Sequence, residues 1–320
     1  MPVNADKPHL WKADIAQSVD FYNRWFIEFA PTAYRETRLQ TAQQVENALA
    51  QTVNLTQITP AILRQYPEIL PILRMATIPP LARDRLIGLA SVTPNLVKTM
   101  EVKQRLPQRM DSIRLDTELS RISQTLLQLI DRDIFPWLSI RQNPMPDEID
   151  RAATVVADRL CGAISDPIIR NAQERRQLAA LQQWLEQQGY TYLPSGTGIS
   201  FDTMLPGTFA FRLNIPVSLQ SGNKQINIPI DVAIMPLLSS PKDFPLLIEA
   251  KSAGDYTNTN KRRKEEAIKI AQLRSNYGER IRFILFLCGY FDSGYLGYEA
   301  AEGIDWVWEH RSDDLAQFGL

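Results

Sequence analysis

Apolar residues recur at helical spacing along the first half of the chain. One stripe consists of Val19, Tyr22, Phe26 and Phe29, which fall three or four positions apart, and a stripe of this kind usually faces a core. Seven prolines follow between positions 60 and 107. Because proline ends or kinks a helix, we expect short helices in that stretch.

A pair of short helices joined by a tight turn is predicted in the same region. We expect the first helix over Leu81–Ala90 and the second from Pro94, with Thr93 as its N-cap. This spacing is typical of a helix-turn-helix, whose second helix would present Asn95 and Lys98 to DNA. A plain helical hairpin is equally consistent with these residues.

The second half of the chain changes to apolar and alternating runs bounded by Gly, Pro and polar residues, which indicates strands. The short connections predict a three-strand meander, with a hairpin turn at 221–224. The last run is apolar enough to be buried on both faces of a sheet. The predicted helices are Ile168–Gln188 and Lys261–Tyr277, and the predicted strands are Tyr190–Leu193, Thr208–Leu219, Gln225–Met235, Phe244–Lys251 and Ile281–Cys288.

This change of pattern predicts two regions, with a boundary between about 145 and 165. The first, residues 1–155, is mostly helical and includes a helix near Asp116–Ile130 before a proline-rich loop at 142–148. The second, residues 156–320, has the order helix, three-strand meander, helix, strand. The expected fold class is therefore α+β or α/β, with a mixed core preceded by a helical region.

Composition narrows the range of functions. The chain of 320 residues is 44% hydrophobic and 22% charged, which is typical of a globular protein. Its two cysteines and two histidines are far apart, which excludes a disulfide scaffold, a zinc ribbon and paired-histidine metal sites. No apolar run reaches the roughly 18 residues of a membrane span, and no secretory signal is visible. We therefore expect a cytoplasmic protein with no membrane association.

The formal net charge of −1 hides an uneven distribution of cations. Residues 60–110 carry eight Arg or Lys against three acids, and residues 251–285 carry nine against four. Segments of this kind are ordinary solvated helix faces in many proteins. In a neutral protein they can also be local phosphate-binding surfaces.

The helix predicted over Lys261–Tyr277 begins with four cations: Lys261, Arg262, Arg263 and Lys264. Cations at a helix N-terminus oppose the macrodipole, so nothing in folding favours this run. A bound phosphate would offset the unfavourable charge, because free N–H groups and cations would bind the same anion. A solvated helix start is the alternative explanation.

Asp231, Glu249 and Lys251 are the main candidates for chemistry. Asp231 lies within an apolar strand, and Glu249 and Lys251 end another strand two residues apart, so both side chains point to one face. Charged groups in such places cost desolvation energy unless something compensates. Two carboxylates on adjacent strands can share Mg²⁺. A lysine beside them, with its pKa lowered by burial and by the cation, can hold or deprotonate an attacking water.

Chance alone produces acid-x-lysine matches in a chain of this length. A second match, Glu101-Val102-Lys103, falls in a helical stretch with no acid on a preceding strand, and we expect it to be a surface pair. The match at 249–251 differs because it ends an apolar strand. It also follows a proline-x-aspartate on the preceding hairpin arm.

The arrangement Pro229-Ile230-Asp231 followed by Glu249-Ala250-Lys251, in its helix–meander–helix–strand order, resembles the PD-(D/E)XK nuclease core. One residue separates proline from aspartate here, a departure that is common in that superfamily. Three segments are similar to the XamI-type family of type II restriction endonucleases. They are residues 18–31, 58–90 and, most specifically, 247–269 (LIEAKSAGDYTNTNKRRKEEAIK).

The resemblance implies a restriction-endonuclease-like catalytic core at 156–320 and a helical region at 1–155 for DNA recognition and dimerisation. Asp231 and Glu249 would bind Mg²⁺, the carbonyl of Ala250 would be a further ligand, and Lys251 would position the nucleophilic water. Many members add an acid from the preceding helix, for which the sequence offers Glu174 and Glu186.

The resemblance also implies the substrate and the partners. The substrate would be double-stranded DNA with a short, palindromic site, because a homodimer matches the symmetry of such a site. A cognate DNA methyltransferase would protect the host genome. The protein would work in the prokaryotic cytoplasm, associated with the nucleoid through DNA.

Two other functions stay open at this point. A repair or junction-resolving nuclease with the same core would follow DNA shape rather than sequence. A non-catalytic helix-turn-helix regulator would bind DNA in a salt-dependent way without cleaving it. The presence of all three candidate residues argues against the regulator.

Overall fold

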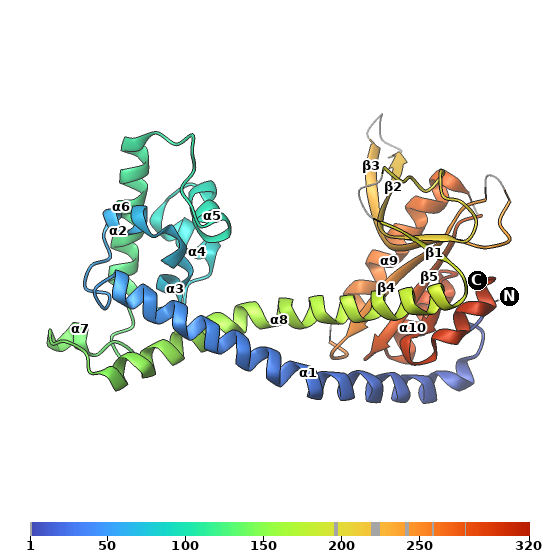
Figure 1. Cartoon of the computed structure of the whole chain (residues 1–320), viewed down its shortest axis with the longest axis horizontal. Helices are drawn as coiled ribbons and strands as arrows, with labels where there is room; N and C mark the ends of the chain where they lie inside the picture. Colours follow the sequence, from blue (N-terminus) through green and yellow to red (C-terminus); the bar gives the residue numbers. More distant parts are fainter. Residues whose placement is uncertain (1, 195–197, 219–224, 241–242, 258, 279) are drawn as a thin grey trace. The chain divides into compact units, whose positions relative to one another are not determined.

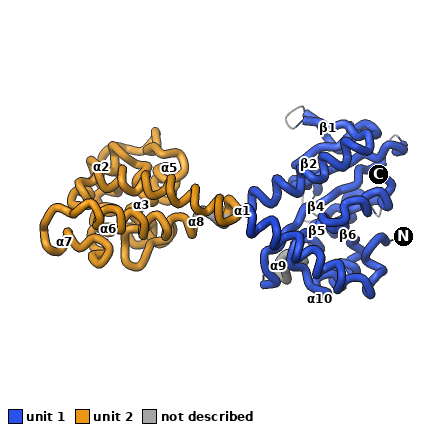
Figure 2. Tube along the Cα trace, turned by 60° about the horizontal axis from the view of Figure 1, so that its bottom comes forward, with its two compact units in different colours: residues 1–29, 170–320 blue, residues 30–169 orange. Residues whose placement is uncertain are grey.

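The computed structural model consists of two compact units (Figure 2). One unit contains residues 1–29 and 170–320, and the other contains residues 30–169. The sequence-based division placed all of residues 1–155 in one region, whereas residues 1–29 group with the sheet. The described residues are 2–194, 198–218, 225–240, 243–257, 259–278 and 280–320.

The unit of residues 30–169 is built from helices, most of them short. Prolines start several of these helices, as the sequence pattern predicts. Both ends of the unit are long helices that continue into the other unit. The helices are α1 (Pro8–Gln51), α2 (Pro60–Gln65), η1 (Pro67–Ile69), α3 (Leu70–Met75), α4 (Arg83–Ala90), α5 (Pro94–Lys103), α6 (Ser112–Leu129), α7 (Trp137–Ile140) and α8 (Pro146–Gln187) (Figure 1).

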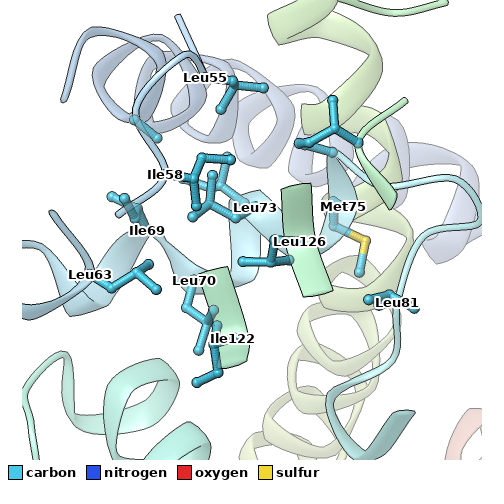
Figure 3. Packing of buried hydrophobic residues seen from close by; sticks show 14 of the residues in the cluster. Leu55, Ile58, Leu63, Ile69, Leu70, Leu73, Met75, Leu81, Ile122 and Leu126 are labelled. Atoms are coloured by element: carbon cyan, nitrogen blue, oxygen red, sulfur yellow. The ribbon is translucent and has the colours of Figure 1, made fainter. Parts of the chain in front are cut away.

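A single hydrophobic cluster forms the core of this unit (Figure 3). Helix α6 contributes Leu119, Ile122 and Leu126, which lie three or four positions apart and are all fully buried. They pack in the same cluster as Leu70 and Leu73 of α3. Burying a side chain of this size contributes about 1.5–3 kcal/mol, so this stripe explains why the predicted helix forms.

Helices α4 and α5 form the predicted pair around a tight turn. Ser91 ends α4 in the left-handed conformation, with φ of 50°, and Thr93 occupies the N-cap position of α5. The predicted N-cap residue is confirmed, although the Thr93 side chain makes no capping hydrogen bond to α5. Its N–H and hydroxyl both donate to Glu118 of α6, the N–H at 2.9 Å. The neighbouring helix therefore fixes the turn.

Glu101 is buried, which corrects the prediction of a surface pair. Its side chain is 3% exposed and forms ion pairs with Arg74 and with Arg83, the latter at 2.6 Å. Arg74 is also buried and donates to the Leu81 carbonyl. The acid therefore joins α5 to α3 and α4, and buried charges of this kind need such partners.

Helix α8 is longer than the helix predicted over 168–188. It has 42 residues and continues through Pro167. The expected proline-rich loop ends in its first turn, where Pro146, Asp147 and Glu148 lie. Proline and acids suit the first turn of a helix, and that explains why the helix starts there.

The second unit is built on a six-stranded sheet in the order β1-β2-β3-β4-β5-β6. Strands β2, β3 and β4 pair antiparallel, as the meander predicts, and β4, β5 and β6 pair parallel. The last predicted strand, Ile281–Cys288, is β5 and pairs with β4 in parallel. The strands are β1 (Thr191–Leu193), β2 (Thr208–Ser218), β3 (Gln225–Met235), β4 (Leu246–Ala253), β5 (Arg282–Gly289) and β6 (Asp305–Trp308).

Both faces of this sheet are covered. Leu247 and Leu285 pack in one hydrophobic cluster with Leu273 of α9 (Thr259–Tyr277), and Ile248 packs in another with Leu181 of α8. Successive residues of a strand point to opposite faces, so β4 and β5 are apolar on both. The prediction that the strand at Ile281–Cys288 is buried on both faces of the sheet is therefore confirmed for β5. The overall fold class is mixed α+β.

The N-terminal apolar stripe is only partly buried. Tyr22 is 5% exposed and its ring contacts Tyr290, whereas Phe26 is 38% exposed. Val19 and Phe29 are half-buried. The expectation that the whole stripe faces a core is therefore wrong for Phe26.

The sequence-based prediction did not include the last elements of the chain: α10 (Ser293–Ala301), β6 and η2 (Glu309–Phe318). The hairpin turn predicted at 221–224 lies outside the described residues. Among the helices of the described part, none combines the length and the apolar character needed to cross a membrane.

Candidate active site

Asp231 and Glu249 lie on neighbouring strands at the point where their pairing ends. Strands β3 and β4 pair with Val232 opposite Ile248, and the two acids are the next residues along. The Asp231 carboxylate accepts a hydrogen bond from the Ala250 N–H at 2.9 Å. This bond links the side chain on one strand to the backbone of the other, so it fixes the carboxylate beside Glu249.

The Glu249 carboxylate is buried between two lysines. Its Oε1 atom lies 2.8 Å from Lys269 Nζ and 3.2 Å from Lys251 Nζ. Lys269 also donates to the Pro229 carbonyl at 3.1 Å. The second oxygen, Oε2, is buried and has no hydrogen-bond partner among the described residues. A buried, unpaired carboxylate oxygen is costly, and a cation would satisfy it.

Lys251 lies between Glu249 and Glu266, and its Nζ atom is 2.9 Å from Glu266 Oε1. Burial lowers the pKa of Lys251, but the two carboxylates outweigh burial and leave the pKa raised. The sequence predicted a lowered pKa for Lys251. The structure gives a raised pKa, because Glu266, which was not part of the expected site, adds a second carboxylate beside the ammonium. Lys251 is therefore a firmly charged donor, suited to holding a water or a phosphate oxygen.

The pKa of Asp231 is raised to about 6, first by burial and then by the neighbouring Glu249 charge. The Ala250 N–H and the positive charges of Lys251 and Lys269 act in the opposite direction. Two facing carboxylates disfavour each other's ionisation, and a bound cation removes that conflict. The electrostatics of the pair therefore favour a positively charged ligand.

A cavity opens beside these residues, and helix α8 forms one of its walls. Glu174 lines it and pairs with Arg212 of β2 at 2.6 Å. Glu186 is not part of the cavity lining; it is exposed and accepts a hydrogen bond from Gln182 at 2.8 Å. Of the two acids that the sequence left open, Glu174 therefore lies at the site. The candidate residues that line the cavity are Asp231, Glu249, Ala250 and Lys251.

Two glutamines of α8 hold that helix against the sheet. Gln173 donates to the Ser252 hydroxyl at 2.8 Å. Gln177 is 1% exposed, and its amide lies 3.3 Å from the carbonyls of both Lys251 and Phe286. These bonds satisfy buried polar groups of β4 and β5, so they also fix the backbone that carries Lys251.

The donor set fits a hard divalent cation. Mg²⁺ is usually bound through one or two carboxylates and keeps several waters. Asp231 and Glu249 supply the carboxylates, and the free Glu249 Oε2 atom is the most evident acceptor. Nowhere in the described ranges do three or more His, Cys, Asp or Glu residues gather as a metal site. A cation here would therefore rest on two acids, the Ala250 carbonyl and water.

The predicted DNA-contacting residues are only partly described. Lys264 is exposed on the first part of α9. Asn95 and Lys98 are exposed on α5 of the helical unit. The side chains that lie outside the described part of the structure are those of Lys261, Arg262 and Arg263.

Sequence reasoning missed the contribution of α9, which comes from Glu266 and Lys269. A signal for it exists, because these residues share a helical face with the buried Ile270 and Leu273, at spacings of three and four. A charged residue on an apolar helix face needs a partner. Lys251 and Glu249 are those partners.

The chain is similar to known restriction enzymes over most of its length. A family model described as XamI restriction endonuclease matches residues 53–308. The type II restriction enzyme SalI of Streptomyces albus G is 53% identical over 317 residues, which is 99% of each chain. The solved structure of protein VC1899 from Vibrio cholerae aligns with a TM-score of 0.30 and 11% identity, over 88% of this chain and 56% of that one. This last likeness is too low to carry an argument.

Proposed function

The chain belongs to the XamI restriction endonuclease family and is therefore a site-specific endonuclease; from this premise we propose that it hydrolyses double-stranded DNA, with Asp231, Glu249 and Lys251 as active-site residues and Mg²⁺ as cofactor. The single observation that carries the proposal is the convergence of these three side chains on one cavity. We further propose a short, palindromic recognition site. The relative named above is described as a type II restriction enzyme.

We assign the metal to Asp231 and Glu249, with the Ala250 carbonyl as a further ligand. When bound, Mg²⁺ supplies charge neutralisation at the phosphate and favours deprotonation of water. Lys251 holds and orients the attacking water, because its ammonium is fixed by Glu249 and Glu266 at 3.2 and 2.9 Å. Preorganised charges of this kind act where negative charge develops.

We propose that residues 170–320 form a PD-(D/E)XK core. The antiparallel strands β2, β3 and β4, the helix α9 and the parallel strand β5 support this proposal. So does the position of Asp231 beside Glu249 at the end of a strand pair.

The helical unit is proposed to contact DNA through α4 and α5, with Asn95 and Lys98 among the contacts, and to take part in dimerisation. Lys261, Arg262, Arg263 and Lys264 are proposed as phosphate contacts. A homodimer, with one active site for each strand, would match a palindromic site. A cognate DNA methyltransferase and a prokaryotic cytoplasmic location, at the nucleoid, complete the proposal.

The test is incubation of the purified chain with unmethylated plasmid and phage DNA in Mg²⁺. We expect discrete fragments, and we expect their loss both in EDTA and in the Lys251→Ala variant. An Arg35→Ala variant is the matched control, because this cation is exposed on α1 and distant in sequence from the site. Binding without cleavage on several DNAs would contradict the proposal and favour a regulator. Cleavage that follows branched structures would favour a junction-resolving nuclease.

A further inference from the structure

The helical unit contains a basic hollow of about 700 Å³ that the proposed active site does not use. The loop between α5 and α6 lines it together with one side of α5 and the first turn of α6. Its cations are Lys103, Arg105, Arg109 and Arg114, and Asp111 is the one acid among its lining residues. We refer to these four cations and the space between them as the basic hollow.

Packing of the loop explains why its arginines point outward. Leu106 and Met110 are half-buried and pack against the core of the helical unit. Arg105 and Arg109, each one residue before them, are exposed. The apolar residues therefore anchor the loop, and the anchored loop holds two guanidinium groups at its surface.

The charges of the basic hollow are poorly compensated. The Asp111 carboxylate is engaged as the N-cap of α6, where it accepts the Arg114 N–H at 3.0 Å. Arg114 itself pairs with Glu118 at 2.9 Å. Lys103, Arg105 and Arg109 form no ion pair within the described ranges. Like charges gathered without acids repel one another, and a bound anion would relieve that repulsion.

Helix α5 joins the basic hollow to the predicted helix-turn-helix pair. Asn95 and Thr99 lie four positions apart on α5 and line the hollow, followed by Lys103 one turn later. One face of the second helix of the pair therefore leads into the cations. In helix-turn-helix proteins the region around the second helix contacts both base edges and phosphates.

We propose that the basic hollow binds the phosphodiester backbone of double-stranded DNA. Duplex DNA carries one charge per roughly 1.7 Å of its axis, so several neighbouring phosphates can meet a group of cations. Arginine suits this partner because its planar fork binds phosphate oxygens through two hydrogen bonds. The inference rests on the proposed function only for the identity of the polyanion, since binding here requires no cleavage.

The test measures the affinity of the full chain for a short duplex in EDTA, at salt concentrations from about 50 to 200 mM. The variant combines Lys103→Gln, Arg105→Gln and Arg109→Gln. We expect the slope of log affinity against log salt to fall by about two to three, because each lost phosphate contact removes about one. The control combines Arg35→Gln, Arg132→Gln and Arg151→Gln, three exposed cations of the same unit outside the basic hollow. Its slope should change by less than about one.

Equal slopes for the two triple variants would overturn the proposal. A fall confined to single-stranded oligonucleotides, with duplex binding unchanged, would also overturn it. Arg105→Lys with Arg109→Lys should keep most of the slope, because the charge is retained. Plasmid cleavage by the unmodified chain is measured separately. Absent cleavage with the expected slope change would remove the nuclease function but support the basic hollow, whereas cleavage with an unchanged slope would do the reverse.

Discussion

Lys251 Nζ lies 2.9 Å from Glu266 Oε1, closer than the 3.2 Å that separates it from Glu249 Oε1. Glu266 belongs to α9 and is 1% exposed. The lysine of the acid-x-lysine motif is therefore held by a residue outside that motif. The position of Lys251 depends on how α9 packs against the sheet.

Glu266→Gln should lower kcat for plasmid cleavage by about 10–100-fold, the range seen when a supporting partner of a site residue is removed. Without the Glu266 charge, Lys251 would be drawn toward Glu249 and away from the water that it is proposed to hold. Steady-state cleavage measurements separate this loss of kcat from a change in KM. Glu266→Ala should be at least as damaging.

Glu28→Gln is the matched control for this prediction, because Glu28 is exposed on α1 and belongs to the same unit. It should leave kcat unchanged. A rise in KM for Glu266→Gln with no change in kcat would show that Glu266 acts on DNA binding instead of on Lys251.

Lys269→Met should make the protein less stable and more responsive to Mg²⁺. Lys269 lies 2.8 Å from Glu249, whose carboxylate is buried. Removing one partner of a buried ion pair costs about 3–5 kcal/mol at most, and less here because Lys251 stays beside Glu249. A cation at the same carboxylate would recover part of the loss, since ligands that bind only the folded state stabilise it.

Melting temperatures with and without Mg²⁺ check this prediction. The increase caused by Mg²⁺ should be larger in Lys269→Met than in the unmodified chain. Lys264→Met, which removes an exposed cation from the same helix, should behave like the unmodified chain. Equal increases in all three proteins would argue against a cation at Glu249.

Much of the sheet and the centre of the site could be predicted from the sequence, because both depend on local pattern. The strand expected over Gln225–Met235 has those bounds in the structure. The spacing of Glu249 and Lys251 places both on one face. What could not be predicted depends on partners far along the chain. Lys269 reaches Glu249 across 20 residues and Arg176 reaches Glu309 across 133.

Prolines predicted the short helices between residues 60 and 107 correctly but misled in the long helix α8. They predict breaks, yet Pro146 begins a helix and Pro167 lies inside one. A proline at a first helical position loses no hydrogen bond. An interior proline is tolerated where tertiary packing outweighs its unfavourable effect, and a single sequence does not reveal that packing.

Glu101→Gln should destabilise the helical unit by about 3–5 kcal/mol. The Glu101 side chain is 3% exposed and pairs with Arg74, whose side chain is 9% exposed, so the change leaves a buried guanidinium with the Leu81 carbonyl but without its charged partner. Chemical denaturation measures the loss as a lower midpoint at unchanged slope. Glu68→Gln is the control, because this acid of η1 forms no ion pair within the described residues. Similar midpoints for the two variants would show that the buried pair contributes little.

Glu299 lies on α10 and is fully buried near Glu266. Burial, followed by the Glu266 charge, raises the pKa of Glu299 to about 8, although the neighbouring Tyr295 hydroxyl acts against the shift. The ordinary pKa of a glutamic acid is near 4.5. The folded protein therefore keeps Glu299 protonated at neutral pH, whereas the unfolded chain does not.

A group whose pKa is raised on folding stabilises the protein at low pH and loses that contribution as the pH rises through the folded value. The unmodified chain should therefore lose stability progressively between about pH 4.5 and pH 8, because over that interval the unfolded chain has released this proton and the folded protein still holds it. Glu299→Gln has a neutral side chain of similar shape, so its melting temperature should fall less over the same interval. Glu28→Gln, which removes an exposed acid of the same unit, should follow the unmodified chain. Parallel curves for all three proteins would mean that folding does not raise the pKa of Glu299.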